Sequence, residues 1–305
     1  MVWMLEDRWP RRNLWRRAVT KRLRAQRDAA TFPPTAPGMA PFAGQPKAET
    51  VGCRSFGMGL SPPRTLLIIP AYREAPRVGA VVARVRQLHP QIDVLVVDDG
   101  SPDHTAAAAR TAGAQVVSHP FNLGYGAGLH TGYCYAWRHG YQRVLQMDAD
   151  GQHDATMLQR LLDALDAGAD VALGSRYLDG SAPPSSLARR IGTRLFAGIA
   201  TRWIGRRITD PTSGFQGLSR RAIEAVVTDA FPEDYPDTDV LIEHHRHGLR
   251  LCEVPVVMHA RLGGLSMHRG ARIAYYGYKM LLTLLLLPVR RPTPTRVRDS
   301  VARCS

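Results

Sequence analysis

The sequence predicts an α/β fold in which a mostly parallel β-sheet carries helices on both faces. Two observations support this prediction. Between residues 65 and 174, short apolar runs alternate with longer stretches of helical periodicity. Polar motifs follow several of these runs, and ligands bind to parallel sheets outside the carboxyl ends of their strands. Strands that alternate with helices form βαβ units, which place helices on both sides of one sheet.

The predicted strands are the short apolar runs at residues 66–69, 92–97, 114–117, 144–147 and 171–173. Helices are predicted between and after them, at residues 78–88, 105–112, 125–139 and 157–165. Beyond residue 174 the alternation weakens. A basic amphipathic helix is predicted over 185–204, a further helix over 239–247 and a strand over 251–257.

The composition is that of a globular protein with a large excess of basic residues. The 305-residue chain is 45% hydrophobic and 22% charged, and its formal net charge is +14. Half of that excess lies in residues 1–60, which contain 11 Lys and Arg against 4 Asp and Glu. A strongly basic chain suits anionic lipid or nucleic acid as a partner.

Three parts are predicted along the chain. Residues 1–60 form a basic extension, rich in Pro, Ala and Gly, that is expected to be disordered. It is either a functional arm or a non-native stretch upstream of a start at Met58. Residues 61–270 form the α/β domain, and residues 271–305 form an amphipathic helix and a basic tail.

The apolar stretch 273–289 is the nearest candidate for a membrane span. It contains Lys279 and is short for a hydrocarbon core of about 30 Å, so attachment to a membrane is expected to be peripheral. No signal peptide is expected, because the basic N-terminus lacks an apolar segment. The four cysteines are far apart in the sequence, as in a reducing compartment.

Two carboxylates one residue apart follow the predicted strand 144–147. Asp148, Asp150 and Gln152 alternate at its carboxyl end, and alternate residues of an extended chain share one face. A few hard oxygen ligands that share a cation with substrate phosphates are typical of a Mg²⁺ or Mn²⁺ site. His153 is a further candidate for a contact in this site. Acidic pairs are also common in solvated turns, so the metal interpretation depends on the other strand ends.

The motifs at the strand ends occur in an order that resembles a known family. They are Ile69-Pro-Ala-Tyr-Arg-Glu74, Val97-Asp-Asp-Gly-Ser101, Asn122-Leu-Gly-x₃-Gly128, Met147-Asp-Ala-Asp-Gly-Gln-His153, Asp210-Pro-Thr-Ser-Gly-Phe215 and Glu253-Val-Pro-Val256, the last followed by Arg261-x-Gly-Gly-x-Ser266. Over about residues 65–270 the chain resembles the GT-A fold, family 2 glycosyltransferases, particularly the dolichyl- or polyprenyl-phosphate mannosyltransferase-like branch. The resemblance implies a Rossmann-like GT-A fold and metal-dependent, inverting transfer from a nucleoside-diphosphate sugar.

The resemblance also implies roles for single residues. It assigns the metal, Mg²⁺ or Mn²⁺, to Asp148, Asp150 and Gln152. It lines the nucleotide pocket with Pro70, Ala71, Tyr72 and Glu74. It gives Asp98 or Asp99 a hydrogen bond to the base or the ribose, for which a GDP- or UDP-linked donor fits equally. A turn that caps the following helix is the alternative role of this acidic pair.

Two arginines and one acid complete the predicted site. Arg176 and Arg261 match positions that resemble the family's phosphate and acceptor contacts, and a planar guanidinium group suits phosphate oxygens. A hydroxyl acceptor needs a catalytic base, whereas a lipid phosphate is already anionic. Asp239 is the candidate base, although the branch often has Glu at this position. The alternative is a carboxylate near a helix N-terminus, where the helix dipole favours it.

Other features have structural interpretations. The helix over 185–204 either lies on a membrane surface or packs on the core with a solvated arginine face. Gly124, Gly128 and Gly132 recur every four residues, which indicates close helix packing and not a dinucleotide-binding loop. The histidines at 244, 245 and 247 are predicted to form a solvated helix face, since adjacent positions diverge by about 100°.

Three functions are consistent with the sequence. The favoured one is a sugar-nucleotide transferase, peripheral at the cytoplasmic face of the membrane, with a polyprenyl phosphate as acceptor and an integral membrane protein as a possible partner. The second uses the same donor chemistry with a saccharide or glycolipid hydroxyl as acceptor. The third is a non-catalytic basic binding module. No nucleic-acid partner is expected for the favoured function.

Overall fold

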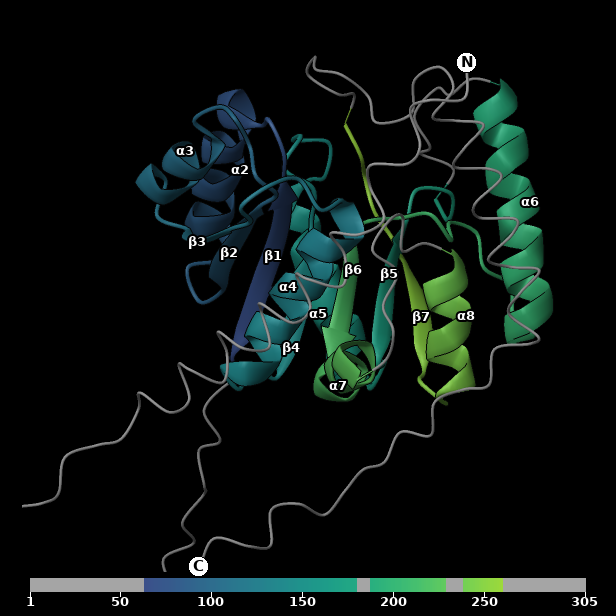
Figure 1. Ribbon diagram of the computed structural model, residues 1–305. Helices are drawn as coiled ribbons and strands as arrows, with labels where there is room; N and C mark the ends of the chain where they lie inside the picture. Colours follow the sequence, from purple (N-terminus) through teal and green to yellow (C-terminus); the bar gives the residue numbers. More distant parts are fainter. Residues whose placement is uncertain (1–62, 180–186, 229–237, 260–305) are drawn as a thin grey trace, which may run out of the picture. The chain divides into compact units, whose positions relative to one another are not determined.

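The computed structural model describes residues 63–179, 187–228 and 238–259 (Figure 1). These residues all belong to the second of two compact units, Leu60–Ser305. The predictions that concern residues 1–60, Arg261 and residues 271–305 lie outside the described residues.

The described residues form one mixed sheet of seven strands in the order β3-β2-β1-β4-β6-β5-β7. The strands are β1 (Thr65–Ala71), β2 (Asp93–Asp98), β3 (Gln115–Ser118), β4 (Arg143–Gln146), β5 (Val171–Ser175), β6 (Gln216–Ser219) and β7 (Leu251–Pro255). Strand β6 is antiparallel to β4 and β5, and the other neighbouring strands pair in parallel. The predicted α/β fold with a mostly parallel sheet is confirmed.

Except for α7, the helices lie close to their predicted positions. They are α2 (Ala75–Leu88), α3 (Thr105–Thr111), α4 (Tyr125–Arg138), α5 (Leu158–Asp166), α6 (Leu187–Ile204), α7 (Arg220–Thr228) and α8 (Thr238–Arg246), with a 3₁₀ turn η1 (Ala155–Met157) before α5. A proline at the first turn of α2 is compatible with its start, because the first N–H groups of a helix have no intrahelical partner.

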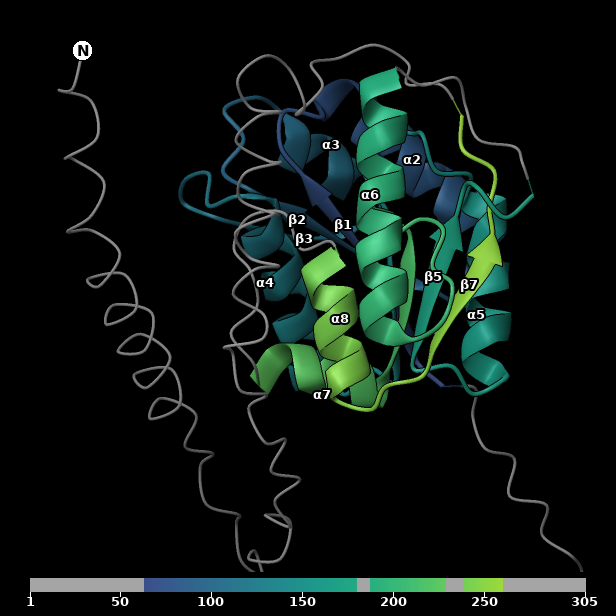
Figure 2. The same ribbon diagram turned by 90° about the vertical axis from the view of Figure 1, so that its right-hand side faces the viewer.

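Alternate side chains of each strand enter two different cores. Ile68 and Val97 pack with α4, α6, α7 and α8, whereas Leu67 and Val96 pack with α2, α3 and α5. This is the alternation expected of a sheet that is covered on both faces. Figure 2, which views the sheet from its β7 edge, shows α4 and α8 on one side of it and α5 on the other.

The sequence did not predict β6 and α7. Residues 216–219 read Gln-Gly-Leu-Ser, which is too short and too polar to be recognised as a buried strand. Because β6 runs opposite to its neighbours, its first residue pairs with the last residue of β4, Gln216 with Gln146. The segment before β6, rather than the segment after it, therefore lies at the carboxyl edge of the sheet.

The glycines of α4 allow the helix to approach β1 closely, as predicted. A Cβ atom on Gly132 would lie 2.5 Å from Ile68 Cγ2, and one on Gly128 would lie 3.6 Å from the Pro70 side chain. Gly124 precedes the helix with a φ of 105°, a conformation that favours glycine. The helix thus packs directly on the strand that leads into the site.

Helix α6 packs on the core, which is one of its two predicted alternatives. Phe196, Ala200 and Ile204, spaced at intervals of four residues, are buried in the core. Ile191 and Leu195, which the sequence placed on the same apolar stripe, are exposed by 57% and 55%. The helix therefore packs on the domain and still presents apolar side chains to its surroundings. No helix within the described ranges is long and apolar enough to cross a membrane.

One of the three histidines at 244, 245 and 247 is buried, which corrects the prediction of a solvated face. His245 is exposed, but His244 is 4% exposed and packs next to Leu241 and Ile242 along the helix. Burial lowers the pKa of His244 to about 4. The sequence rule that adjacent helix positions diverge holds, but it does not say which of them faces the core.

Candidate active site

The loop after β1 is tied to the loop after β2 by hydrogen bonds. Arg73 adopts a φ of 58°, which is uncommon for a residue other than glycine, and its N–H donates to Ser101 Oγ at 3.0 Å. The N–H of Glu74 donates to Thr105 Oγ1 at 2.9 Å, and the Glu74 carboxylate pairs with Arg77. Tyr72, the first residue after β1, is 41% exposed.

The predicted nucleotide residues of β1 occupy two environments. Pro70 and Ala71 are the buried final residues of the strand, whereas Tyr72 and Glu74 lie in the loop beyond it. The structure therefore brings the whole motif to the carboxyl edge of the sheet. The nucleotide-binding role of these residues stays a prediction.

The acidic pair Asp98 and Asp99 at the end of β2 is buried, and both carboxylates accept hydrogen bonds from nearby backbone N–H groups. Asp98 Oδ1 accepts the Ser101 N–H at 3.1 Å, which closes the turn. Asp99 accepts the N–H groups of Leu123 at 2.8 Å and Gly124 at 2.9 Å, and its Oδ1 lies 2.7 Å from His119 Nδ1. Asp99 thus holds the segment that leads into α4, which resembles the predicted turn alternative, although the bonds reach a later helix.

Asp148 is held from two sides and remains partly exposed. Its side chain is 35% exposed, and its Oδ1 accepts the Tyr125 hydroxyl at 2.9 Å. Its backbone N–H donates to His153 Nδ1 at 3.1 Å, so the proton of the neutral imidazole lies on Nε2. Nε2 is 3.9 Å from Asp148 Oδ2. Burial lowers the pKa of His153, although Asp148 and Asp150 oppose this effect.

Asp150 and Gln152 continue the same loop. Asp150 Oδ1 accepts the Gln152 N–H at 3.0 Å. Gln152 pairs with His259, whose N–H donates to the Gln152 carbonyl at 2.8 Å. The loop is therefore anchored to the segment that follows β7, which the sequence did not predict.

The chemistry of Asp148, Asp150 and Gln152 suits a hard divalent cation, because all three supply oxygen. In the part of the chain that the structure describes, no group of three His, Cys, Asp or Glu side chains is arranged to hold a metal ion. Two carboxylates together with the phosphates of a ligand form a common Mg²⁺ site, so the residues present fit such a shared site. The metal assignment stays a prediction.

Arg176 forms a buried, bidentate ion pair with Asp210. Its Nε and one terminal nitrogen each lie 2.6 Å from an oxygen of Asp210, which is 0% exposed. Glu253 in turn accepts the N–H groups of Thr209 and Asp210 at 2.9 Å. Asp210 therefore occupies the Nε–Nη2 edge of the guanidinium group. This arrangement indicates that Arg176 supports the 209–215 segment.

Asp239, the candidate base, lies in the first turn of α8 and is 5% exposed. Helix α8 runs antiparallel to β7, so its first turn lies toward the carboxyl edge of the sheet (Figure 2). Next to it, Thr238 Oγ1 is buried and has no hydrogen-bond partner among the described residues. Arg261, the other predicted acceptor contact, lies outside the described residues.

Several supporting residues were not assigned by the sequence. Tyr125, Asp210 and Glu253 all contact predicted site residues or the segments that carry them. The last two lie in motifs that carry the family resemblance, so a signal was present. Tyr125 had no such signal, because its contact with Asp148 spans 23 residues.

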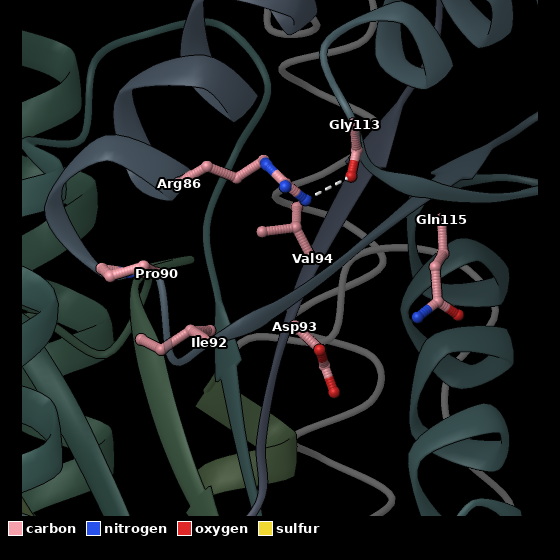
Figure 3. Close-up of a pocket in the computed structure, with 7 residues that line it drawn as sticks. All are labelled: Arg86, Pro90, Ile92, Asp93, Val94, Gly113 and Gln115. Atoms are coloured by element: carbon pink, nitrogen blue, oxygen red, sulfur yellow. Dashed lines mark hydrogen bonds between the residues drawn. The ribbon is translucent and has the colours of Figure 1, made fainter.

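A pocket at the other end of the sheet contains none of the predicted site residues. Its lining residues come from α2, the amino ends of β2 and β3, and the turns beside them (Figure 3). Arg86 crosses it and donates to the Gly113 carbonyl at 2.6 Å. Parallel sheets bind ligands at their carboxyl edge, so we do not assign the site to this pocket.

Comparisons with known proteins agree with the geometry. The profile of Glycosyl transferase family 2 matches residues 66–227. The chain is 35% identical to polyprenol monophosphomannose synthase of Mycolicibacterium smegmatis, over 71% of this chain and 85% of the relative. It is 33% identical to undecaprenyl-phosphate mannosyltransferase of Micrococcus luteus, over 68% of this chain and 88% of the relative.

A solved structure shares the fold. Glucosyl-3-phosphoglycerate synthase from Mycobacterium tuberculosis, crystallised with Mn²⁺ and UDP-glucose, is 20% identical and covers 73% of this chain and 78% of its own. Its TM-score is 0.58. The fold, the profile match and the curated relatives together show that the chain is a hexose-transferring enzyme of glycosyl transferase family 2, with relatives in the polyprenyl-phosphate mannosyltransferase branch.

Proposed function

We propose that the protein moves a hexose, with inversion, from a nucleoside-diphosphate sugar to a polyprenyl phosphate, with Mg²⁺ or Mn²⁺ as cofactor. The observation that carries this proposal is the partly exposed Asp148 at the carboxyl edge of the sheet, with Asp150 two residues further on. The names of the mannosyltransferase relatives support the lipid phosphate as acceptor.

The departing diphosphate gains negative charge as the sugar leaves, and preorganised charges that match this change lower the barrier. A bound divalent cation supplies Lewis-acid stabilisation of that charge. Asp148 and Asp150 are the residues that would hold the cation. The loops after β1 and β2 bind the nucleoside, with Tyr72 exposed after β1 and Asp98, the register partner of Ala71, at the end of β2.

The burial of the candidate base Asp239 suits a phosphate acceptor. Asp239 is almost fully buried in the first turn of α8, where the helix dipole stabilises a carboxylate. A lipid phosphate is anionic near neutral pH and needs no proton removed, whereas a saccharide hydroxyl does. The burial of Asp239 thus supports the first acceptor class over the second.

Helix α6 supports peripheral binding at the cytoplasmic face of the membrane. Ile191, Leu195 and Trp203 are exposed apolar residues, and Arg190, Arg194 and Arg202 are exposed on the same helix. Apolar and basic side chains on one helix suit the boundary between acyl chains and anionic headgroups. The variant Ile191→Ser/Leu195→Ser should co-sediment less with anionic vesicles, whereas equal sedimentation would contradict this role.

The donor site is tested by thermal-shift measurements with GDP, UDP and their sugars, with and without Mn²⁺. A ligand at 100 times its Kd stabilises the fold by about 2.7 kcal/mol. We expect metal-dependent stabilisation by one nucleotide in the wild type and in Asp163→Ala, an exposed acid on α5, and its loss in Asp150→Ala. No stabilisation by any nucleotide would contradict the proposed donor chemistry.

The acceptor is tested with the nucleotide that stabilises the protein. Transfer of a radiolabelled sugar to a polyprenyl phosphate in detergent is the expected result. Transfer to a saccharide alone would support the second acceptor class. Binding to anionic vesicles without any transfer, retained in Asp150→Ala and weakened by salt, would support a basic binding module.

A further inference from the structure

Three hydrogen bonds in series end on the carboxylate of Asp148. The Tyr133 hydroxyl donates to Gln146 Oε1 at 2.6 Å, and Gln146 Nε2 donates to the Tyr125 hydroxyl at 3.1 Å. The Tyr125 hydroxyl then donates to Asp148 Oδ1 at 2.9 Å. Tyr125 and Tyr133 lie on α4 and Gln146 is the last residue of β4, so the series joins a helix to the strand that leads into the loop.

The direction of all three bonds follows from the carboxylate. An ionised carboxylate only accepts hydrogen bonds, so the single hydroxyl proton of Tyr125 points to Asp148. Tyr125 must then accept from Gln146, which turns the amide oxygen of Gln146 toward Tyr133. Tyr133 is 3% exposed, and burial raises the pKa of its hydroxyl, so it stays a donor. Hydrogen bonds that point the same way strengthen one another.

The backbone at Gly214 lies close to Tyr125 and Asp148 and leaves no space for a larger side chain there. A Cβ atom on Gly214 would lie 3.0 Å from the Tyr125 hydroxyl and 3.2 Å from Asp148 Oδ2. On the strand side, His153 accepts the Asp148 backbone N–H and packs on Phe215, with ring centroids 5.0 Å apart. The carboxylate is therefore held by the Tyr125 hydroxyl of α4, with His153 Nε2 of its own loop 3.9 Å away and Gly214, before β6, close beside it.

We infer that Tyr125, Gln146 and Tyr133 are positioning residues that fix the orientation of Asp148 for cation binding. This inference rests on the proposed metal-dependent function. Tyr125 engages Oδ1, which leaves Oδ2 to bind a divalent cation. Groups that orient a metal ligand typically change metal affinity by about 10- to 100-fold when they are removed.

The test is a titration of the full-length protein with Mn²⁺, alone and with inorganic pyrophosphate, followed by the EPR signal of free Mn²⁺. Tyr125→Phe should raise the Kd for Mn²⁺ about tenfold. Tyr133→Phe leaves two of the three bonds in place and should raise it roughly threefold. Tyr135→Phe is the matched control, because it removes a hydroxyl of the same helix that donates to Gln115 instead.

The outcomes separate this inference from the proposed function. Equal Mn²⁺ binding by wild type and Asp148→Asn would overturn the metal-dependent function itself. If Asp148→Asn loses Mn²⁺ but Tyr125→Phe binds it as Tyr135→Phe does, the function stands and the inference is overturned. Melting temperatures without metal show whether each variant is folded. If Tyr125→Phe does not fold, Tyr133→Phe decides the question, since it leaves Tyr125 in place.

Discussion

Asp99 and Asp148 both follow parallel strands at the same edge of the sheet, but their surroundings differ. Asp99 is 4% exposed, and its two oxygens are engaged by two backbone N–H groups and by His119. The Asp148 side chain is 35% exposed and accepts the Tyr125 hydroxyl on one oxygen. The carboxylate of Asp99 is used by the fold, whereas that of Asp148 keeps capacity for a ligand.

The same contrast applies to the basic residues. Arg176 was expected to contact a phosphate, but its guanidinium group is paired with the buried Asp210. The position of a charged residue after a strand therefore predicts that it lies near the site. Its hydrogen-bond partners decide whether it stabilises the fold or can bind the ligand. Three substitutions test this division, and a fourth tests a buried histidine away from this edge.

The largest effect is expected for Asp148→Asn. The rate of sugar transfer should fall about 1,000-fold, as when one preorganised group that stabilises transition-state charge is removed. The free energy of unfolding should change by less than about 0.5 kcal/mol, because the residue is partly exposed. Transfer assays with radiolabelled donor and chemical denaturation measure the two quantities. Asp163→Asn, an exposed acid on α5, is the control, and equal loss of activity in both variants would contradict the assignment.

Arg176→Met should lower the free energy of unfolding by about 3 kcal/mol, because it leaves the buried Asp210 without its partner. Denaturation in guanidinium chloride measures this loss. The exposed Arg194→Met is the matched control. Arg176→Met/Asp210→Asn should recover part of the stability, since no buried charge is left unpaired. An unchanged midpoint in Arg176→Met would show that the pair does not support the fold.

Asp99→Asn should lower the free energy of unfolding by about 2 kcal/mol, because an amide group cannot accept all the hydrogen bonds that the carboxylate accepts. Transfer activity at a temperature where the variant is folded should fall much less than in Asp148→Asn. A large loss of activity with unchanged stability would contradict the conclusion that Asp99 stabilises the fold and does not bind the ligand.

The smallest effect is a pH dependence that arises far from this edge. His244 has a pKa lowered to about 4 by burial, against 6.5 for an exposed histidine. Below pH 6.5 the unfolded state binds more protons than the folded state, so stability is complete above this pH and is lost as the pH falls toward 4. Between pH 7 and 5.5 the loss should be about 1 kcal/mol. The loss should be smaller by about this amount in His244→Leu and should persist in full in His245→Leu, as followed by denaturation at each pH.

Most of the fold could be predicted from the sequence, because apolar runs and helical periodicity are local signals. Strand β6 could not, since its four residues carry no such pattern and its place in the sheet comes from pairing with β4 and β5. The split of α6 into buried and exposed apolar residues could not be predicted either, since it depends on which face the core covers. The burial of His244 has the same cause.

The sequence by itself determined the α/β architecture and the placement of the acidic motifs at strand ends, because both follow from residue spacing along a short stretch of chain. Only the tertiary structure decided which charged side chains have hydrogen-bond or ion-pair partners within the fold. The partners of Asp148 and Arg176 lie 23 and 34 residues away, at Tyr125 and Asp210. Hydrogen bonds at such separations form only after helices and strands have packed, so no local pattern in the sequence records them.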